Sequence, residues 1–126
     1  MKNIVVMGST GSIGIQSLDV ISKHNSHKVA GLTCHSNADL LFEQTEKYLP
    51  DFIAIDVIDP SHSLFNLCKE NNIELITGSD ASSNIPFKNL DLAINAIVGT
   101  SGLRPTIELI KNGVDIALSN KESLVL

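Results

Sequence analysis

Short runs of β-branched and aliphatic residues alternate with longer amphipathic segments, and this alternation constrains the fold more than any other feature of the sequence. It is typical of strand-helix-strand units that build a buried parallel sheet. Right-handed crossovers with short connections favour an α/β fold of Rossmann type: a doubly wound, mostly parallel sheet with helices on both faces. A barrel would need about eight such units. The expected strands are 3–7, 28–33, 52–56, 73–77, 91–95 and 115–118, and the expected helices are 12–23, 38–48, 60–71 and 103–112.

Local signals mark several of these helix ends. Asn37 is a suitable N-cap for the second helix, and Asp59 followed by Pro60 offers a side-chain acceptor before a residue suited to the first helical turn. Gly113 after Asn112 predicts the end of the fourth helix. The Ser-rich stretch 78–88 has no clear period and is interpreted as a surface connection.

Composition narrows the class of protein. The 126 residues suffice for one domain with its own core, and 43% of them are apolar. A net charge of -5 argues against nucleic acid as a partner, because such binding depends on Lys and Arg at phosphates. No apolar run approaches the ~20 residues that span a bilayer, so no membrane association is expected. Cys34 and Cys68 suggest reduced thiols, and the chain enters its first strand without a signal peptide, so the expected location is cytoplasmic.

A glycine-rich turn stands where a dinucleotide phosphate turn belongs, between the first strand and the first helix. Gly8 can make the tight turn, Gly11 lets backbone approach a pyrophosphate, and Gly14 lets the helix pack closely on the sheet. The amides around Ser12 and Ile13 would face the anion. The spacing G-x-x-G-x-x-G is only moderately specific, and a ligand-free serine-rich turn is the alternative interpretation.

The loop after the second strand carries no carboxylate to select NAD and no Lys or Arg to select NADP. Ser36 and Asn37 can donate hydrogen bonds, and His35 could stack on adenine or pair with phosphate when protonated. An exposed His35 without a partner is an equally open alternative. His62 is expected on a helix surface, and metal binding by His24 and His27 is improbable.

Three motifs together resemble one family, 1-deoxy-D-xylulose 5-phosphate reductoisomerase, over the whole chain. They are Gly8-Ser9-Thr10-Gly11-Ser12-Ile13-Gly14 followed by Ser17-Leu18-Asp19-Val20; Ala96-Ile97-Val98-Gly99 with Gly102-Leu103 and Pro105-Thr106; and Asn120-Lys121-Glu122-Ser123. The resemblance implies that residues 1–126 form the NADPH-binding domain, and that the catalytic and C-terminal domains lie outside this chain. Many members carry Gly, then Lys or Arg, at the positions of His35 and Ser36, so recognition of the 2′-phosphate is a point of departure.

The resemblance also implies roles for individual residues. Thr10, Gly11, Ser12 and Ile13 would wrap the cofactor pyrophosphate, with Asn37 at the adenosine end. Asn120 and Glu122 would contact the cofactor near the nicotinamide, and Lys121 would bind the phosphosugar substrate, as suits an ammonium beside phosphate and hydroxyls.

Further expectations follow from the same family. Its members convert 1-deoxy-D-xylulose 5-phosphate to 2-C-methyl-D-erythritol 4-phosphate in non-mevalonate isoprenoid biosynthesis, with NADPH and a divalent metal, Mg or Mn, and the full-length protein is expected to be a homodimer. No metal ligand and no catalytic residue is expected within this chain. The alternatives are another NADP-dependent reductase, such as a homoserine or semialdehyde dehydrogenase, and a nucleotide-binding module without catalysis.

Overall fold

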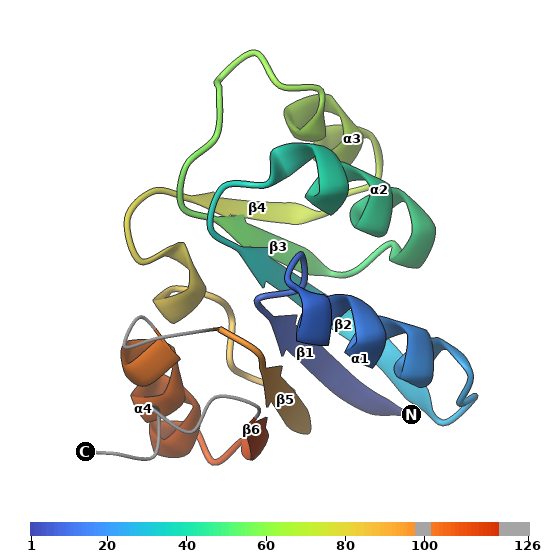
Figure 1. Cartoon of the computed structure of the whole chain (residues 1–126), viewed down its shortest axis with the longest axis vertical. Coiled ribbons are helices and arrows are strands. Elements are labelled where there is room, and N and C mark those ends of the chain that lie inside the picture. Colours follow the sequence, from blue (N-terminus) through green and yellow to red (C-terminus); the bar gives the residue numbers. More distant parts are fainter. Residues whose placement is uncertain (98–101, 119–126) are drawn as a thin grey trace.

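The chain folds as one parallel sheet flanked by helices, in a computed structural model that describes residues 1–97 and 102–118 (Figure 1). The strands are β1 (Lys2–Met7), β2 (His27–Cys34), β3 (Phe52–Ile55), β4 (Glu74–Thr77), β5 (Leu92–Asn95) and β6 (Asp115–Leu118). The helices are α1 (Ser12–Ser22), α2 (Ala38–Tyr48), α3 (Leu64–Glu70) and α4 (Leu103–Lys111), with a 3-10 turn, η1, at Ala81–Ser83. The predicted strands and helices, apart from α3, have ends that differ from these by at most one residue.

The order of the strands in the sheet predicts where a ligand would bind. It is β4-β3-β2-β1-β5-β6, and all five pairings are parallel. The chain builds outward from β1 to β4, then returns to the other side of β1 and continues with β5 and β6. The order therefore reverses between β1 and β5, and in such sheets ligands bind at this switch point, beyond the carboxyl ends of the strands.

Two hydrophobic layers cover the sheet. Leu18 of α1, Leu41 of α2 and Leu64 of α3 pack in one core cluster with the strand residues that face them. Leu109 of α4 and Ala81 of η1 belong to the cluster on the opposite side. Figure 1 shows α1 and α2 side by side over the sheet and α4 apart from them. The predicted Rossmann-type architecture, with helices on both faces, is confirmed.

The start of the third helix differs from the prediction. Asp59 does not cap a helix at Pro60, because its Oδ1 accepts hydrogen bonds from the backbone N (2.9 Å) and the hydroxyl (2.8 Å) of Ser61, which makes a tight turn. The helix begins only at Leu64. Asp59 and Pro60 therefore form a turn, and the predicted helix start at Pro60 is four residues too early.

His62 is not a helix-surface residue. It precedes α3, its side chain is only 17% exposed, and its Nε2 lies 2.7 Å from Asp39 Oδ1 at the start of α2. Its Nδ1 accepts a hydrogen bond from the backbone N of Leu64 at 3.0 Å. His62 therefore joins the beginnings of two neighbouring helices.

The segment 78–88 is more than a surface connection. It contains η1, in which Ala81 and Ser83 are buried, and Ile85 is also part of the core. This segment folds against the same face of the sheet as α4, so its polar residues are held beside the carboxyl ends of the strands.

Other sequence expectations can be checked directly. Cys34 and Cys68 are both free thiols and both buried. Within the two described stretches, no helix has the length and the apolar composition needed to cross a membrane.

Candidate cofactor site

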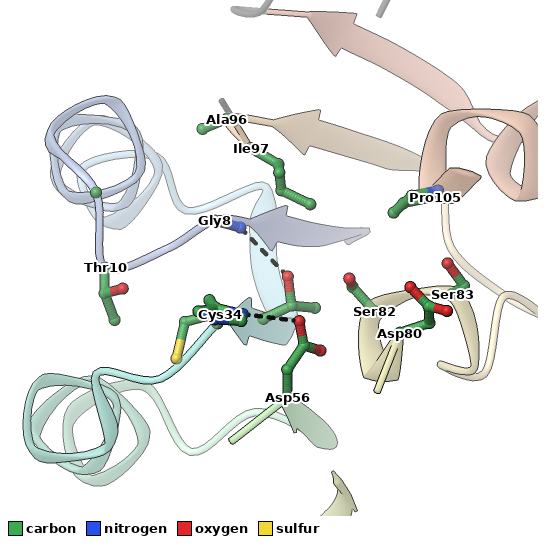
Figure 2. A pocket seen from close by; sticks show the side chains of 13 residues that line it. Gly8, Thr10, Cys34, Asp56, Asp80, Ser82, Ser83, Ala96, Ile97 and Pro105 are labelled. Atoms are coloured by element: carbon green, nitrogen blue, oxygen red, sulfur yellow. Dashed lines mark hydrogen bonds and ion pairs between the residues drawn. The ribbon is translucent and has the colours of Figure 1, made fainter. Parts of the chain in front are cut away.

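A pocket of about 390 Å³ opens at the switch point of the sheet. Figure 2 shows side chains from the ends of several strands converging on it, with the 3-10 turn and the start of α4 forming the opposite wall. Its position matches the crevice that the strand order predicts. The lining residues are Gly8, Thr10, Gly11, Thr33, Cys34, His35, Asp56, Asp80, Ser82, Ser83, Ala96, Ile97 and Pro105.

The glycines of the first turn have the geometry that their spacing predicts. Gly8 has a φ of +79°, and a Cβ there would lie 2.9 Å from the carbonyl carbon of Ala96. A Cβ on Gly14 would lie 2.2 Å from the carbonyl oxygen of Gly8, so only glycine allows α1 to pack so close. Gly11 is different: its backbone is extended, and of the residues that the structure describes an added Cβ would meet only Gly8 O, at 3.7 Å. The space over Gly11 is open to a ligand.

The same turn is anchored on two sides. The backbone N of Gly8 and of Ser9 donate to the carbonyl oxygen of Thr33, at 2.9 and 2.8 Å. Ser9 and Gln44 are both buried and exchange two hydrogen bonds of 2.8 Å: the Ser9 hydroxyl donates to Gln44 Oε1, and Gln44 Nε2 donates to the Ser9 carbonyl. The turn is thereby fixed to β2 and to α2.

The N-terminus of α1 is available to an anion. Gly11 is its N-cap residue and no side chain caps the helix, so the first amides have no intrahelical or side-chain acceptor. Thr10 and Gly11 line the pocket. Ser12 and Ile13 lie on the first turn of α1 and are exposed, and the Ile13 side chain lines a separate shallow hollow with Val20.

The loop after β2 is divided between two hollows. His35 lines the main pocket, and its Nδ1 lies 3.1 Å from Asp56 Oδ2, so the alternative of a histidine without a partner is wrong. Ser36 and Asn37 line a second hollow of about 320 Å³ beside it. Asn37 Oδ1 accepts from the backbone N of Leu40 at 3.3 Å, which confirms the predicted cap of α2.

Sequence reasoning missed the acidic and hydroxyl groups of the far wall. Asp56 follows β3, and Asp80, Ser82 and Ser83 lie in or next to η1. Asp80 Oδ2 accepts a hydrogen bond from Arg104 Nη1 at 2.8 Å, which offsets its charge. The one available signal was the position of Asp56 at the carboxyl end of a buried strand, because all such ends meet at one edge of a parallel sheet.

Cys34 forms an apolar part of the pocket wall. Burial raises the pKa of its thiol from 9.0 to about 11, an effect that a hydrogen bond with the side chain of Thr10 only partly opposes. The thiol therefore stays protonated at neutral pH and behaves as a small hydrophobic group.

Comparison with known proteins decides the family. The sequence model of 1-deoxy-D-xylulose 5-phosphate reductoisomerase matches residues 4–126, almost the entire chain. The chain belongs to the 1-deoxy-D-xylulose 5-phosphate reductoisomerase family.

Relatives of this name occur in several bacteria. The reductoisomerase of Thermoanaerobacter pseudethanolicus is 40% identical over 126 residues, which cover 99% of this chain and 33% of the relative. That of Elusimicrobium minutum is 43% identical over 130 residues, covering all of this chain and 32% of the relative. The chain thus spans about a third of the length of the curated relatives it matches.

Solved reductoisomerase structures share the fold. The enzyme of Zymomonas mobilis in complex with NADPH is 32% identical, with a TM-score of 0.85 over 98% of this chain and 33% of that one. A second structure, in complex with NADPH, fosmidomycin and magnesium, is 28% identical, with a TM-score of 0.85 over 99% of this chain and 31% of that one. The alternative of a homoserine or semialdehyde dehydrogenase is not supported.

Part of the site that the reductoisomerase resemblance predicts lies outside the described residues. Asn120, Lys121 and Glu122 belong to the segment 119–126, for which the structure gives no description. Within residues 1–97 and 102–118, no group of three or more His, Cys, Asp or Glu side chains could hold a metal ion.

Proposed function

We propose that residues 1–126 are the NADPH-binding domain of an enzyme that converts 1-deoxy-D-xylulose 5-phosphate to 2-C-methyl-D-erythritol 4-phosphate in isoprenoid biosynthesis. Membership of the reductoisomerase family supports the reaction, and NADPH is present in two of the solved structures with the same fold. This chain would supply the cofactor-binding site but no catalytic residue.

The observation that carries this proposal is the glycine turn at the switch-point pocket. The space over Gly11 is open, the amides that follow it are uncapped, and the turn is fixed to β2 and α2. A pyrophosphate placed there would receive backbone N–H groups at the positive end of the α1 dipole. The residues present therefore fit a dinucleotide.

Each predicted residue has a role in this arrangement. Thr10, Gly11, Ser12 and Ile13 surround the pyrophosphate, and His35, Ser36 and Asn37 lie toward the adenosine. Asn120 and Glu122 contact the cofactor near the nicotinamide, and Lys121 binds the phosphosugar. When bound, NADPH supplies the hydride that reduces the rearranged substrate. The described residues bind and position that donor.

The complete enzyme is proposed to require a divalent metal, Mg or Mn, to be a homodimer and to act in the cytoplasm. Magnesium accompanies the related structure that contains NADPH and fosmidomycin, and a further related structure is also in complex with magnesium. The metal's carboxylate ligands are expected in the part of the enzyme outside this chain, because hard cations are held by oxygen ligands.

The test uses the full-length enzyme with magnesium. Fluorescence titration should show saturable binding of NADPH, and oxidation of NADPH should depend on added 1-deoxy-D-xylulose 5-phosphate. If NADPH binds but this substrate is not turned over, the chain is a dinucleotide-binding domain with another function, and the proposed reaction is wrong. Absence of binding would remove the proposal altogether.

A further inference from the structure

The cofactor pocket is acidic in the part that the structure describes. Of the residues 1–97 and 102–118 that line it, none is Lys or Arg, and the ionisable groups besides Cys34 are His35, Asp56 and Asp80. Arg104 pairs with Asp80 at 2.8 Å and offsets that carboxylate. Among the residues that the structure describes, Asp56 has no such cationic partner apart from His35, whose charge depends on its protonation.

Asp56 is held firmly by two neighbours. Its Oδ1 accepts a hydrogen bond from the backbone N of Ala81 at 3.0 Å, and its Oδ2 lies 3.1 Å from His35 Nδ1. The side chain of Asp56 is 25% exposed, whereas that of His35 is 76% exposed. The carboxylate is therefore fixed between η1 and the loop after β2, and it orients a ring that is otherwise free to turn in solvent.

This orientation determines which ring atom meets a ligand. A carboxylate only accepts hydrogen bonds, so the proton of the neutral imidazole lies on Nδ1, and Nε2 presents a lone pair. Nε2 is then an acceptor for a hydroxyl group. A phosphate offers only acceptors to the neutral ring, and the negative charge of Asp56 lies directly behind that ring.

The position of the His35–Asp56 pair indicates which part of the cofactor it would contact. His35 follows β2, and the end of this strand is where Rossmann-type domains recognise the adenosine ribose: a carboxylate there binds the 2′-hydroxyl of NAD, and a cation there binds the 2′-phosphate of NADP. The loop itself has neither group. Asp56 brings a carboxylate to the same place from the adjacent strand, β3.

We propose that the His35–Asp56 pair is a specificity-determining element that weakens the preference for NADPH, so that this domain also binds NADH with comparable affinity. The proposal rests on the function proposed above. Asp56 acts as a positioning residue for His35 and as a fixed negative charge against the 2′-phosphate.

The experiment compares NADPH and NADH by fluorescence titration of the full-length enzyme. In the wild type, the two dissociation constants should differ by less than about tenfold. Asp56→Asn keeps an oxygen for the amide of Ala81 but removes the charge, so the preference for NADPH should rise about tenfold. Asp115→Asn is the matched control, because it removes the same charge from the exposed start of β6, which does not line the pocket, and it should leave the ratio unchanged.

The ratio of the two dissociation constants distinguishes a role in specificity from a purely structural role. A purely structural role of Asp56 would weaken both cofactors equally, and an unchanged ratio in Asp56→Asn overturns the proposal. A wild-type preference for NADPH above about tenfold overturns it as well, while leaving the proposed function intact. If neither cofactor binds the wild type, the proposed function and this inference both fail.

Discussion

The three glycines of the turn between β1 and α1 differ in which substitutions they tolerate. Gly8 needs positive φ, Gly14 has no room for a Cβ, and Gly11 has both ordinary backbone angles and open space. The sequence suggested this division of roles from spacing alone. The backbone angle of Gly11, on which the effect of a substitution depends, required the structure.

Gly11→Val should therefore abolish NADPH binding and leave the fold intact, because the branched side chain fills the space that the pyrophosphate needs. Circular dichroism and cofactor titration measure the two effects separately. Gly14→Ala is the contrasting variant and should lower stability strongly, because its Cβ would collide with backbone atoms of Gly8 and Ser9. Normal NADPH affinity in a folded Gly11→Val protein would exclude this turn as the phosphate site.

The two thiols should react slowly with disulfide reagents in the native protein. Burial raises the pKa of Cys34, and likewise that of Cys68, from 9.0 to about 11. At pH 8 a shift of this size lowers the thiolate fraction roughly a hundredfold, and limited access slows the reaction further. The rate should climb with pH until the thiols ionise near pH 11. Bound NADPH should protect Cys34 but not Cys68, since only Cys34 lines the pocket.

Among the elements, α2 has a part in the site that its sequence did not suggest. It holds the glycine turn through the buried pair of Ser9 and Gln44, although these residues are 35 positions apart. Gln44 is only 7% exposed although its side chain is polar. Its burial follows from how α2 packs on the sheet, which no local pattern in the sequence specifies.

Gln44→Leu should lower the free energy of unfolding by about 1–3 kcal/mol and weaken NADPH binding, because the hydroxyl and carbonyl of Ser9 stay buried without their partners. Thr45→Val is the matched control on the same helix. The Thr45 hydroxyl is buried and has no hydrogen-bond partner within the described residues, so its replacement by an isosteric methyl should be neutral or stabilising. Urea unfolding of both variants measures the difference. Equal stability of the two would contradict a structural role for Gln44.

Helices and strands with a clear periodicity of apolar residues could be predicted, whereas short irregular elements could not. The strands and the helices α1, α2 and α4 follow from apolar periodicity and caps. The start of α3 was misplaced because Asp59 and Pro60 suit a turn as well as a helix start. The 3-10 turn at Ala81–Ser83 has too few residues to show a period, and its burial depends on the strands and on α4 that it packs against.

At the scale of the molecule, fold and family could be read from the sequence, but only part of the pocket could. The strand order brings the ends of β1, β2, β3 and β5 together, and Asp56 enters the pocket for this reason alone. Sequence patterns show which residues follow a strand. They do not show which strand lies next to which, so the partner of His35 stayed hidden.

The isolated 126-residue chain should bind NADPH more weakly than the full-length enzyme and should not turn over 1-deoxy-D-xylulose 5-phosphate. The chain spans about a third of its relatives, and the remainder is expected to complete the nicotinamide pocket and to supply the metal ligands. Parallel titrations and assays of the fragment and the full-length enzyme measure both effects. Turnover by the fragment would show that the catalytic residues lie within it.

The two anchors of the glycine turn have a kinetic consequence. Because Thr33 and Gln44 hold the turn in place, its backbone is ordered before any ligand arrives. Capture of the pyrophosphate then needs no loop folding, and little conformational entropy is lost at this end of the cofactor. The encounter between dinucleotide and turn is closer to a rigid docking event than to an induced fit, and its rate is governed by diffusion and orientation.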